Sequence, residues 1–271
     1  MTAADEGWEG LRRKTPLIGI ATLFLLFFGL FWGFHGIVAL VDTRYLAAAF
    51  YLPAGSGCLI LAVSTLAIVV WRRRSGLPTR IDPIGPGGVS IMLPVTYRAG
   101  YLAVFVLTLV SSAVFAFGVW TDRLTFPMTG GQFALFPYVA AALALYAAGA
   151  LLFRVSGRLR FPEILCTPTT LAVQTSRVRD EIAWDDIVSV EPTVSGNSMA
   201  ILVEPRDGAK VAVEVFYRGP LAPSPEDPIV CNVDLFPVGP EALLDFLRYY
   251  LDRPESRAEL DNGRAVERLR Q

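Results

Sequence analysis

Residues 16–41 read PLIGIATLFLLFFGLFWGFHGIVALV, a run of 26 residues without a charged side chain. Three further uncharged runs follow before residue 154, and each is long enough to cross the roughly 30 Å hydrocarbon core of a bilayer as a helix. Unpaired backbone groups in hydrocarbon cost several kcal/mol each, so helices are the structure to expect. The sequence therefore predicts four transmembrane helices, at about residues 16–41, 45–71, 99–121 and 132–153.

The charges between these runs predict the orientation of the helices. The segments before the first run, between the second and third, and after the fourth are rich in arginine and lysine, whereas the other two connections carry one charge of each sign. Lys and Arg are retained on the cytoplasmic side. We expect a multi-pass protein of the cytoplasmic membrane with both termini in the cytoplasm and the lipid bilayer as a partner. The basic residues expected at the membrane surface are Arg72, Arg73, Arg74, Arg154, Arg158 and Arg160.

Small residues inside the runs mark faces where helices approach closely. Gly29 and Gly33 are about one turn apart in the first run, and Ala140, Ala144 and Ala148 repeat that spacing in the fourth. Such faces suit helix–helix packing. We expect contact within one four-helix bundle, with a dimer seam as the alternative, so an oligomer remains open.

The connection between the second and third runs contains a candidate strand. A turn rich in proline and glycine covers residues 83–88, and apolar side chains at Val89, Ile91 and Leu93 then follow a period of two. The pattern leaves open whether residues 81–93 form a strand of a second or of a composite domain.

After residue 160 the hydrophobic period changes. Short stretches such as residues 211–217 place an apolar side chain at every second position, with turn residues between them. This alternation is typical of an antiparallel sheet with one buried face. A proline at position 240, followed by an acid, then starts a final amphipathic helix. The predicted fold class is an α-helical membrane bundle of four transmembrane helices followed by a small α+β cytoplasmic domain.

One stretch in this region carries a family resemblance. Residues 182–190 read IAWDDIVSV and lie between short strands, with the amphipathic helix at the end. This arrangement resembles the pleckstrin-homology-like (PH-like) domains of bacterial membrane proteins, in which a strand often ends in a Trp-x-Asp-Ile step. The resemblance implies an antiparallel PH-like sheet or barrel, and Trp184 and Ile187 are expected to be buried in its core. Six clear strands can be counted, where the family fold has seven.

The expected domain boundaries follow from these patterns. Residues 1–15 form a cytoplasmic N-terminus, residues 16–160 the transmembrane domain, and residues 161–253 the PH-like domain. The remainder, residues 254–271, is a charged tail that forms a loose amphipathic helix or stays disordered.

The sequence lacks the residue patterns that are typical of catalytic and metal-binding sites. His35 is the only histidine and lies inside the first run, where we expect a neutral, hydrogen-bonded imidazole. No Cys and His spacing suits zinc, and no glycine motif for a nucleotide is present. We therefore expect no enzyme activity, no catalytic residue, no cofactor and no metal. The charge balance also argues against nucleic acid as a partner.

The charge distribution indicates the kind of partner. Residues 1–160 hold 13 basic and 6 acidic residues, whereas residues 161–271 hold 11 and 19. Anionic lipid repels a domain of that sign, and a basic protein surface attracts it. Arg177 and Arg179 lie in the region where phosphoinositide-binding relatives carry basic residues. Four acids follow closely and cancel most of their field, so we expect no lipid binding there; these acids are Asp180, Glu181, Asp185 and Asp186.

The sequence thus predicts a non-enzymatic integral membrane scaffold that presents an acidic PH-like domain, residues 161–253, to a cytoplasmic protein partner. One alternative is a lipid- or small-molecule-binding membrane protein whose transmembrane helices form a cavity. A further alternative is a transporter subunit regulated by the domain.

Overall fold

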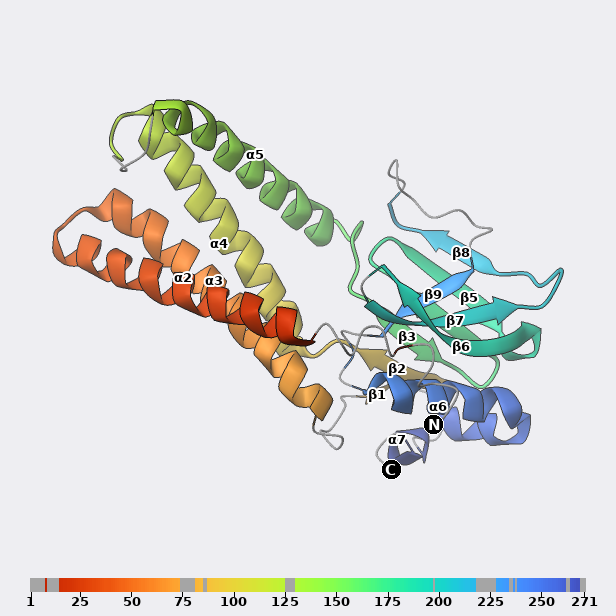
Figure 1. Ribbon diagram of the computed structural model, residues 1–271. Helices are drawn as coiled ribbons and strands as arrows, with labels where there is room; N and C mark the ends of the chain where they lie inside the picture. Colours follow the sequence, from red (N-terminus) through yellow and green to blue (C-terminus); the bar gives the residue numbers. More distant parts are fainter. Residues whose placement is uncertain are drawn as a thin grey trace. The chain divides into compact units, whose positions relative to one another are not determined.

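The computed structural model consists of four long helices and an α+β region (Figure 1). The structure describes residues 8, 15–73, 81–84, 87–124, 130–196, 198–217, 228–233, 236, 238–261 and 264–268.

The four helices confirm the predicted membrane-spanning runs. They are α2 (Thr15–Val41), α3 (Tyr45–Arg73), α4 (Val95–Trp120) and α5 (Gly130–Val155). All four are long and apolar enough to cross a membrane. Helix α4 begins four residues earlier than predicted, because Arg98 lies in its first turn, and a charge there does not interrupt helical hydrogen bonding.

Close approach of backbones places α2 against α3. A Cβ atom added at Gly55 would lie 2.7 Å from the backbone nitrogen of Gly33 and 2.9 Å from the carbonyl oxygen of Gly29. Only glycine fits at that separation. The predicted Gly29–Gly33 face therefore packs within one chain, against α3. In the fourth helix, Ala144 is buried and Ala140 and Ala148 are half-buried, and α5 packs along α4.

The α+β region contains two antiparallel sheets. Sheet A has the order β1-β2-β3-β4-β5-β8, and sheet B has the order β6-β7-β9. The strands are β1 (Ile81–Ile84), β2 (Gly88–Met92), β3 (Glu163–Cys166), β4 (Thr170–Gln174), β5 (Val178–Ala183), β6 (Ile187–Ser195), β7 (Ser198–Pro205), β8 (Ala212–Val215) and β9 (Ile229–Asn232). Seven of them follow residue 160, one more than predicted. The strand that the sequence does not reveal is β3, because four residues between prolines are too few to show a period.

Strands from the connection between α3 and α4 complete sheet A. Strand β2 pairs with β3 in the register Val89↔Cys166 and Ile91↔Ile164, and all four side chains are buried. The predicted boundaries therefore need correction. Residues Ile68–Pro94 belong to one compact unit with Gly157–Gln271, and the transmembrane unit consists of Pro16–Ala67 and Val95–Ser156. We call the first unit the composite domain. Long-range strand pairing, which local alternation does not specify, joins its parts.

Strand β6 departs from simple alternation. Ile187 and Val190 are both buried although they are three residues apart, and Val188 between them is 57% exposed. A bulge between Ile187 and Ser189 accounts for this, since one extra residue reverses the faces of the strand. Exposed Val188 and buried Val190 therefore lie on opposite sides of the bulged strand, although a regular strand would place both side chains on one face.

The chain ends in ordered helical segments. Helix α6 (Pro240–Asp252) packs against β6 and β7 through an apolar face that includes Leu243 and Leu247. It is followed by the 3-10 helix η2 (Pro254–Leu260) and by α7 (Arg264–Arg268). Leu260 and Ala265 are buried, so over its described residues the tail is neither loose nor disordered.

Candidate interaction surface

Trp184 organises one end of the composite domain. It begins a short 3-10 helix, η1 (Trp184–Asp186), its side chain is fully buried, and its indole N–H donates to the carbonyl oxygen of Thr167 at 2.8 Å. Ile187, which follows η1, is also buried. The predicted burial of both residues is confirmed. The Trp-x-Asp-Ile step is thus a structural element that links the two sheets.

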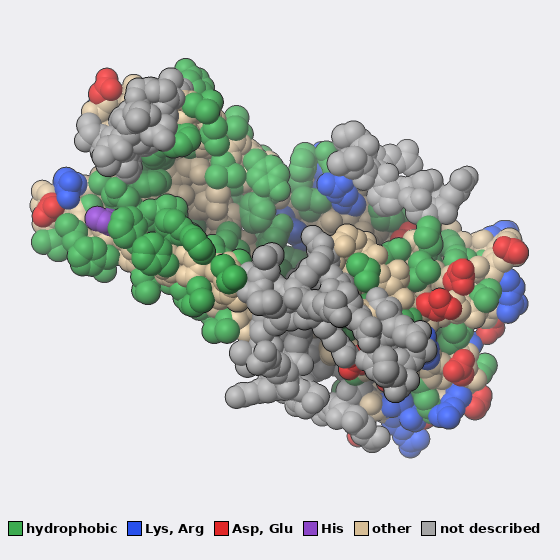
Figure 2. Space-filling model, in the orientation of Figure 1, with side chains coloured by type: hydrophobic (Ala, Val, Ile, Leu, Met, Phe, Trp, Pro, Cys, Tyr) green, Lys and Arg blue, Asp and Glu red, His purple; other side chains and the backbone are tan. Residues whose placement is uncertain are grey.

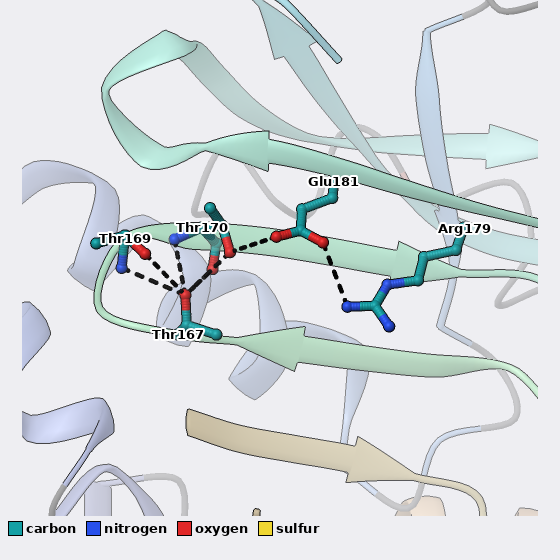
Figure 3. Close-up of polar contacts among 5 residues, drawn as sticks. All are labelled: Thr167, Thr169, Thr170, Arg179 and Glu181. Carbon is teal, nitrogen blue, oxygen red and sulfur yellow. Dashed lines mark hydrogen bonds and ion pairs between the residues drawn. The ribbon is translucent and has the colours of Figure 1, made fainter. Parts of the chain in front are cut away.

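A network of threonines supports the turn beneath Trp184 (Figure 3). The hydroxyl oxygen of Thr167 accepts from the backbone N–H of Thr170 at 2.8 Å, and the hydroxyl of Thr170 donates to Glu181 at 3.1 Å. The other carboxylate oxygen of Glu181 lies 3.3 Å from the guanidinium of Arg179. The network fixes the β3–β4 turn and pairs the charge of Arg179.

Arg257 ties the tail to this end of the domain. Its side chain is buried, its Nη1 lies 2.6 Å from the carboxylate of Asp185, and its Nε donates to the carbonyl oxygen of Tyr250 at 2.9 Å. The Asp185 carboxylate is 85% exposed, so this ion pair lies at the surface. No local sequence signal links Arg257 to a residue 72 positions away.

Trp8 is a second residue that sequence reasoning missed. Its indole N–H donates to the carbonyl oxygens of Thr193 at 2.9 Å and Ala200 at 3.2 Å, and its side chain is 1% exposed. Thr193 and Ala200 face each other in the β6–β7 register. The Trp8 side chain therefore lies over sheet B at this pair. The sequence signal that could have indicated this burial is a single tryptophan among the charged residues of the N-terminal segment.

Acidic side chains dominate the exposed charged residues of the composite domain. Figure 2 shows several of them on the face in view. The exposed acids are Asp185, Glu191, Glu204, Asp207, Glu214, Glu241, Asp245, Asp252, Glu255, Asp261 and Glu267, which we call the acidic surface. The exposed bases in the same described ranges are Arg158, Arg160, Arg206, Lys210, Arg253, Arg264 and Arg268. Among its described large apolar side chains only Val188 and Val194 are exposed, so contacts of this surface are mainly polar.

The structure describes the side chains of three of the six predicted membrane-surface arginines, those that lie at or after the end of α5. The Arg154 guanidinium lies 5.2 Å from the ring centroid of Tyr101, joining the end of α5 to the start of α4. Arg158 and Arg160 follow α5 and are exposed. The side chains of Arg72, Arg73 and Arg74 lie outside the described residues.

The remaining reactive side chains in the described ranges are His35 and the cysteines. The ring of His35 lies 4.5 Å from that of Phe31 and 5.8 Å from that of Tyr51, among aromatic neighbours. Cys166 and Cys231 are buried, and burial raises the pKa of both thiols, that of Cys231 to about 12. Thiols with such pKa values stay protonated at neutral pH. Among the described residues no three His, Cys, Asp or Glu side chains are grouped to hold a metal ion.

Comparisons with protein-family models, curated proteins and solved structures found no match to this chain.

Proposed function

We propose that the protein is a non-enzymatic membrane scaffold that presents the acidic surface of the composite domain to a basic protein partner in the cytoplasm. The observation that carries this proposal is the excess of exposed acids over exposed bases, with only two exposed large apolar side chains in the described domain. Complementary charge steers association and selects partners. A surface of this kind suits a reversible complex better than a permanent apolar interface.

The composite domain is built from three segments of the chain, and this supports a location of all three on the same side of the bilayer. The domain contains Trp8, the β1–β2 strands and the chain after Gly157. A chain with four membrane-spanning helices joins these three segments in one domain only when all of them lie on the same side of the bilayer. The arginine-rich connections support a cytoplasmic location for that side, because Lys and Arg are retained in the cytoplasm.

We further propose that residues 161–253 form a PH-like domain. In favour of this, the region has seven strands divided between two antiparallel sheets, and helix α6 follows them. Strands β1 and β2 extend the sheet by a hairpin from the membrane unit. Strand β8 pairs with β5 instead of its neighbour in the chain, β7.

A photo-crosslinking experiment in living cells tests the scaffold proposal. A photoreactive amino acid replaces Val188, which is 57% exposed on β6, in the full chain. We expect crosslinks to one basic protein. Crosslinking should fall several-fold when Glu191, Glu204 and Asp207 are changed to Gln or Asn, since each exposed ion pair contributes up to about 1 kcal/mol.

A second variant neutralises three acids in another part of the acidic surface, Glu241, Asp245 and Glu255 on α6 and η2, and locates the contact within that surface. Equal loss in both variants would indicate general electrostatic attraction and not a defined surface. Crosslinks to lipid alone, with a defined lipid copurifying, would contradict the scaffold and favour a lipid-binding protein.

A further inference from the structure

Trp8 covers one end of the outer face of sheet B, the face that points away from the core. In this sheet β7 lies between β6 and β9 (Figure 1). Ile201 and Val203 on β7 are fully buried in the core, so the alternate residues Ala200 and Leu202 lie on the outer face. Ala200 is nevertheless fully buried, and Trp8 donates to its carbonyl oxygen. The indole of Trp8 therefore lies on the outer face, over Ala200.

Apolar and acidic side chains continue the outer face beyond Trp8. Glu191 on β6 is opposite Leu202 in the β6–β7 register, and Glu204 lies two residues beyond Leu202. Both carboxylates are exposed, and Leu202 is half-buried. The hydroxyl of Ser189 donates to Glu204 at 2.9 Å. Val188, which is exposed at the bulge, lies on the same side of β6. The outer face thus offers an apolar strip with two carboxylates beside it.

The charge of the outer face is negative. The charged residues of β6, β7 and β9 are Glu191 and Glu204, and these strands carry no base. Arg206 follows the end of β7, but Asp207 is next to it and both are exposed. Arg248 is at the edge of β6, where its Nε donates to a backbone carbonyl oxygen at 2.9 Å. Lys or Arg side chains of a partner are the complement of this face.

The segment that carries Trp8 lacks that complement next to the ring. Residues 5–9 read DEGWE, so the close neighbours of Trp8 in the sequence have the same sign of charge as the outer face. The bases of the segment, residues 12–14, directly precede helix α2. Like charges repel at short range. A segment with an aromatic ring flanked by Lys or Arg therefore fits the outer face better than the chain's own segment.

We propose that the outer face of sheet B is the binding site for the basic partner and that Trp8 closes this site in the free protein. An aromatic side chain of the partner takes the place of Trp8 over Ala200, and its Lys or Arg side chains lie opposite Glu191 and Glu204. The N-terminal segment then regulates the scaffold, because binding requires the release of Trp8. The inference rests on the proposed function for the partner, whereas the closing of the site by Trp8 does not.

The burial of Trp8 determines the direction of the expected effect. Its side chain is 1% exposed and its indole makes two hydrogen bonds, so the closed form dominates in the free protein. A site that is open in only a fraction of the molecules binds with an affinity reduced by that fraction. Loss of the Trp8 side chain should therefore strengthen binding at the outer face. Loss of a residue that only stabilises the fold would weaken binding or leave it unchanged.

Binding of a defined peptide to the full chain in phosphatidylcholine nanodiscs tests the proposal. The probe is a fluorescein-labelled peptide, KKGWKGLRRK, which corresponds to residues 5–14 with the three acids replaced by lysine. Fluorescence anisotropy gives its affinity. We expect Trp8→Ala to bind the probe about tenfold or more tightly than the unmodified chain, and Trp8→Phe to be intermediate. A peptide with alanine in place of the tryptophan should not bind.

Charge variants locate the probe on the outer face. In the Trp8→Ala chain, Glu191→Gln with Glu204→Gln should weaken probe binding up to about 25-fold, because an exposed ion pair contributes up to about fivefold. The matched control is Asp261→Asn with Glu267→Gln, which removes two exposed acids from the end of the chain and should leave binding within about twofold. Trp120→Ala, at an exposed tryptophan of the membrane unit, should bind the probe like the unmodified chain.

Two results would overturn the proposal. One is that Trp8→Ala and Trp8→Phe both bind the probe no more tightly than the unmodified chain. The other is that the peptide without tryptophan binds as tightly as the probe.

Photo-crosslinking from Val188 in cells separates this inference from the proposed function. We expect Trp8→Ala to raise the yield of crosslinks to the basic partner. A yield that does not change with Trp8 would contradict the closing of the site and leave the scaffold intact. The absence of protein crosslinks from every variant would contradict the scaffold, and stronger probe binding in Trp8→Ala would still show that Trp8 closes the outer face.

Discussion

Replacement of Trp8 by alanine should release the N-terminal segment from the composite domain. The side chain is fully buried and donates to two carbonyl oxygens on β6 and β7. Truncation of a buried tryptophan costs about 3–5 kcal/mol. Trp8→Phe keeps most of the apolar contact and loses both hydrogen bonds, so we expect about 1–2 kcal/mol for that variant.

Proteolysis at the N-terminus measures this free energy. Arg12, Arg13 and Lys14 provide trypsin sites next to the segment. When opening is rapid, the cleavage rate follows the population of the open form. We expect cleavage at these sites to accelerate roughly 150- to 4,000-fold in Trp8→Ala, and roughly 5- to 30-fold in Trp8→Phe. Mass spectrometry of the released N-terminal peptide gives both rates.

Trp120→Ala is the matched control, because Trp120 is 53% exposed at the end of α4. It should leave the N-terminal cleavage rate unchanged. A wild-type rate in Trp8→Ala would refute the burial of Trp8 against sheet B. If only Trp8→Phe were cleaved at the wild-type rate, the two hydrogen bonds would make no net contribution to the free energy that holds Trp8 against sheet B.

Three further predictions concern the composite domain. Trp184→Ala should destabilise it by about 3–5 kcal/mol in denaturant unfolding of the full chain, and a change below about 1 kcal/mol would mean that the side chain is exposed. Ile91→Ala on β2 should destabilise β3 and β4 by about 2–5 kcal/mol in hydrogen exchange, whereas a change confined to β1 and β2 would contradict the composite sheet. Burial raises the pKa of Tyr250 to about 12, so its stabilising contribution is complete below about pH 10 and lost as the pH rises through 12. Tyr250→Phe should remove this alkaline loss, at most roughly 3 kcal/mol, from the pH dependence of unfolding.

The membrane helices could be predicted because a bilayer imposes a local requirement. Each helix needs one uninterrupted apolar run, and the start of α4 at Val95 instead of residue 99 is a small departure. The burial of Trp184 could be predicted equally well, since a large aromatic residue at the end of a strand is normally part of a core.

The composite domain was not predictable in the same way. Alternation at Val89 and Ile91 indicates a strand, but its pairing with β3 joins residues more than 70 positions apart. The same holds for the contact of Trp8 with the β6–β7 pair and for the ion pair of Arg257 with Asp185. These contacts depend on the path of the whole chain.

The surroundings of Arg177 show the same limit. Arg158 and Arg160 were expected at the membrane surface from their position after the fourth helix. Arg177 was grouped with the acids that follow it, because sequence distance was the available measure of proximity. The structure separates Arg177 from Asp185 by the length of β5 and places it beside Tyr217.

The sidedness of the composite domain tests the central claim most directly, because a cytoplasmic partner requires the acidic surface in the cytoplasm. Single cysteines are introduced at exposed positions, as Asp42→Cys and Arg123→Cys in the short connections and Asp207→Cys in the domain. Intact cells are labelled with a membrane-impermeant maleimide, and the unmodified chain, whose Cys166 and Cys231 are buried, gives the background. We expect labelling of Asp42→Cys and Arg123→Cys in intact cells, and of Asp207→Cys only after permeabilisation. Labelling of Asp207→Cys in intact cells would place the acidic surface outside and contradict the scaffold.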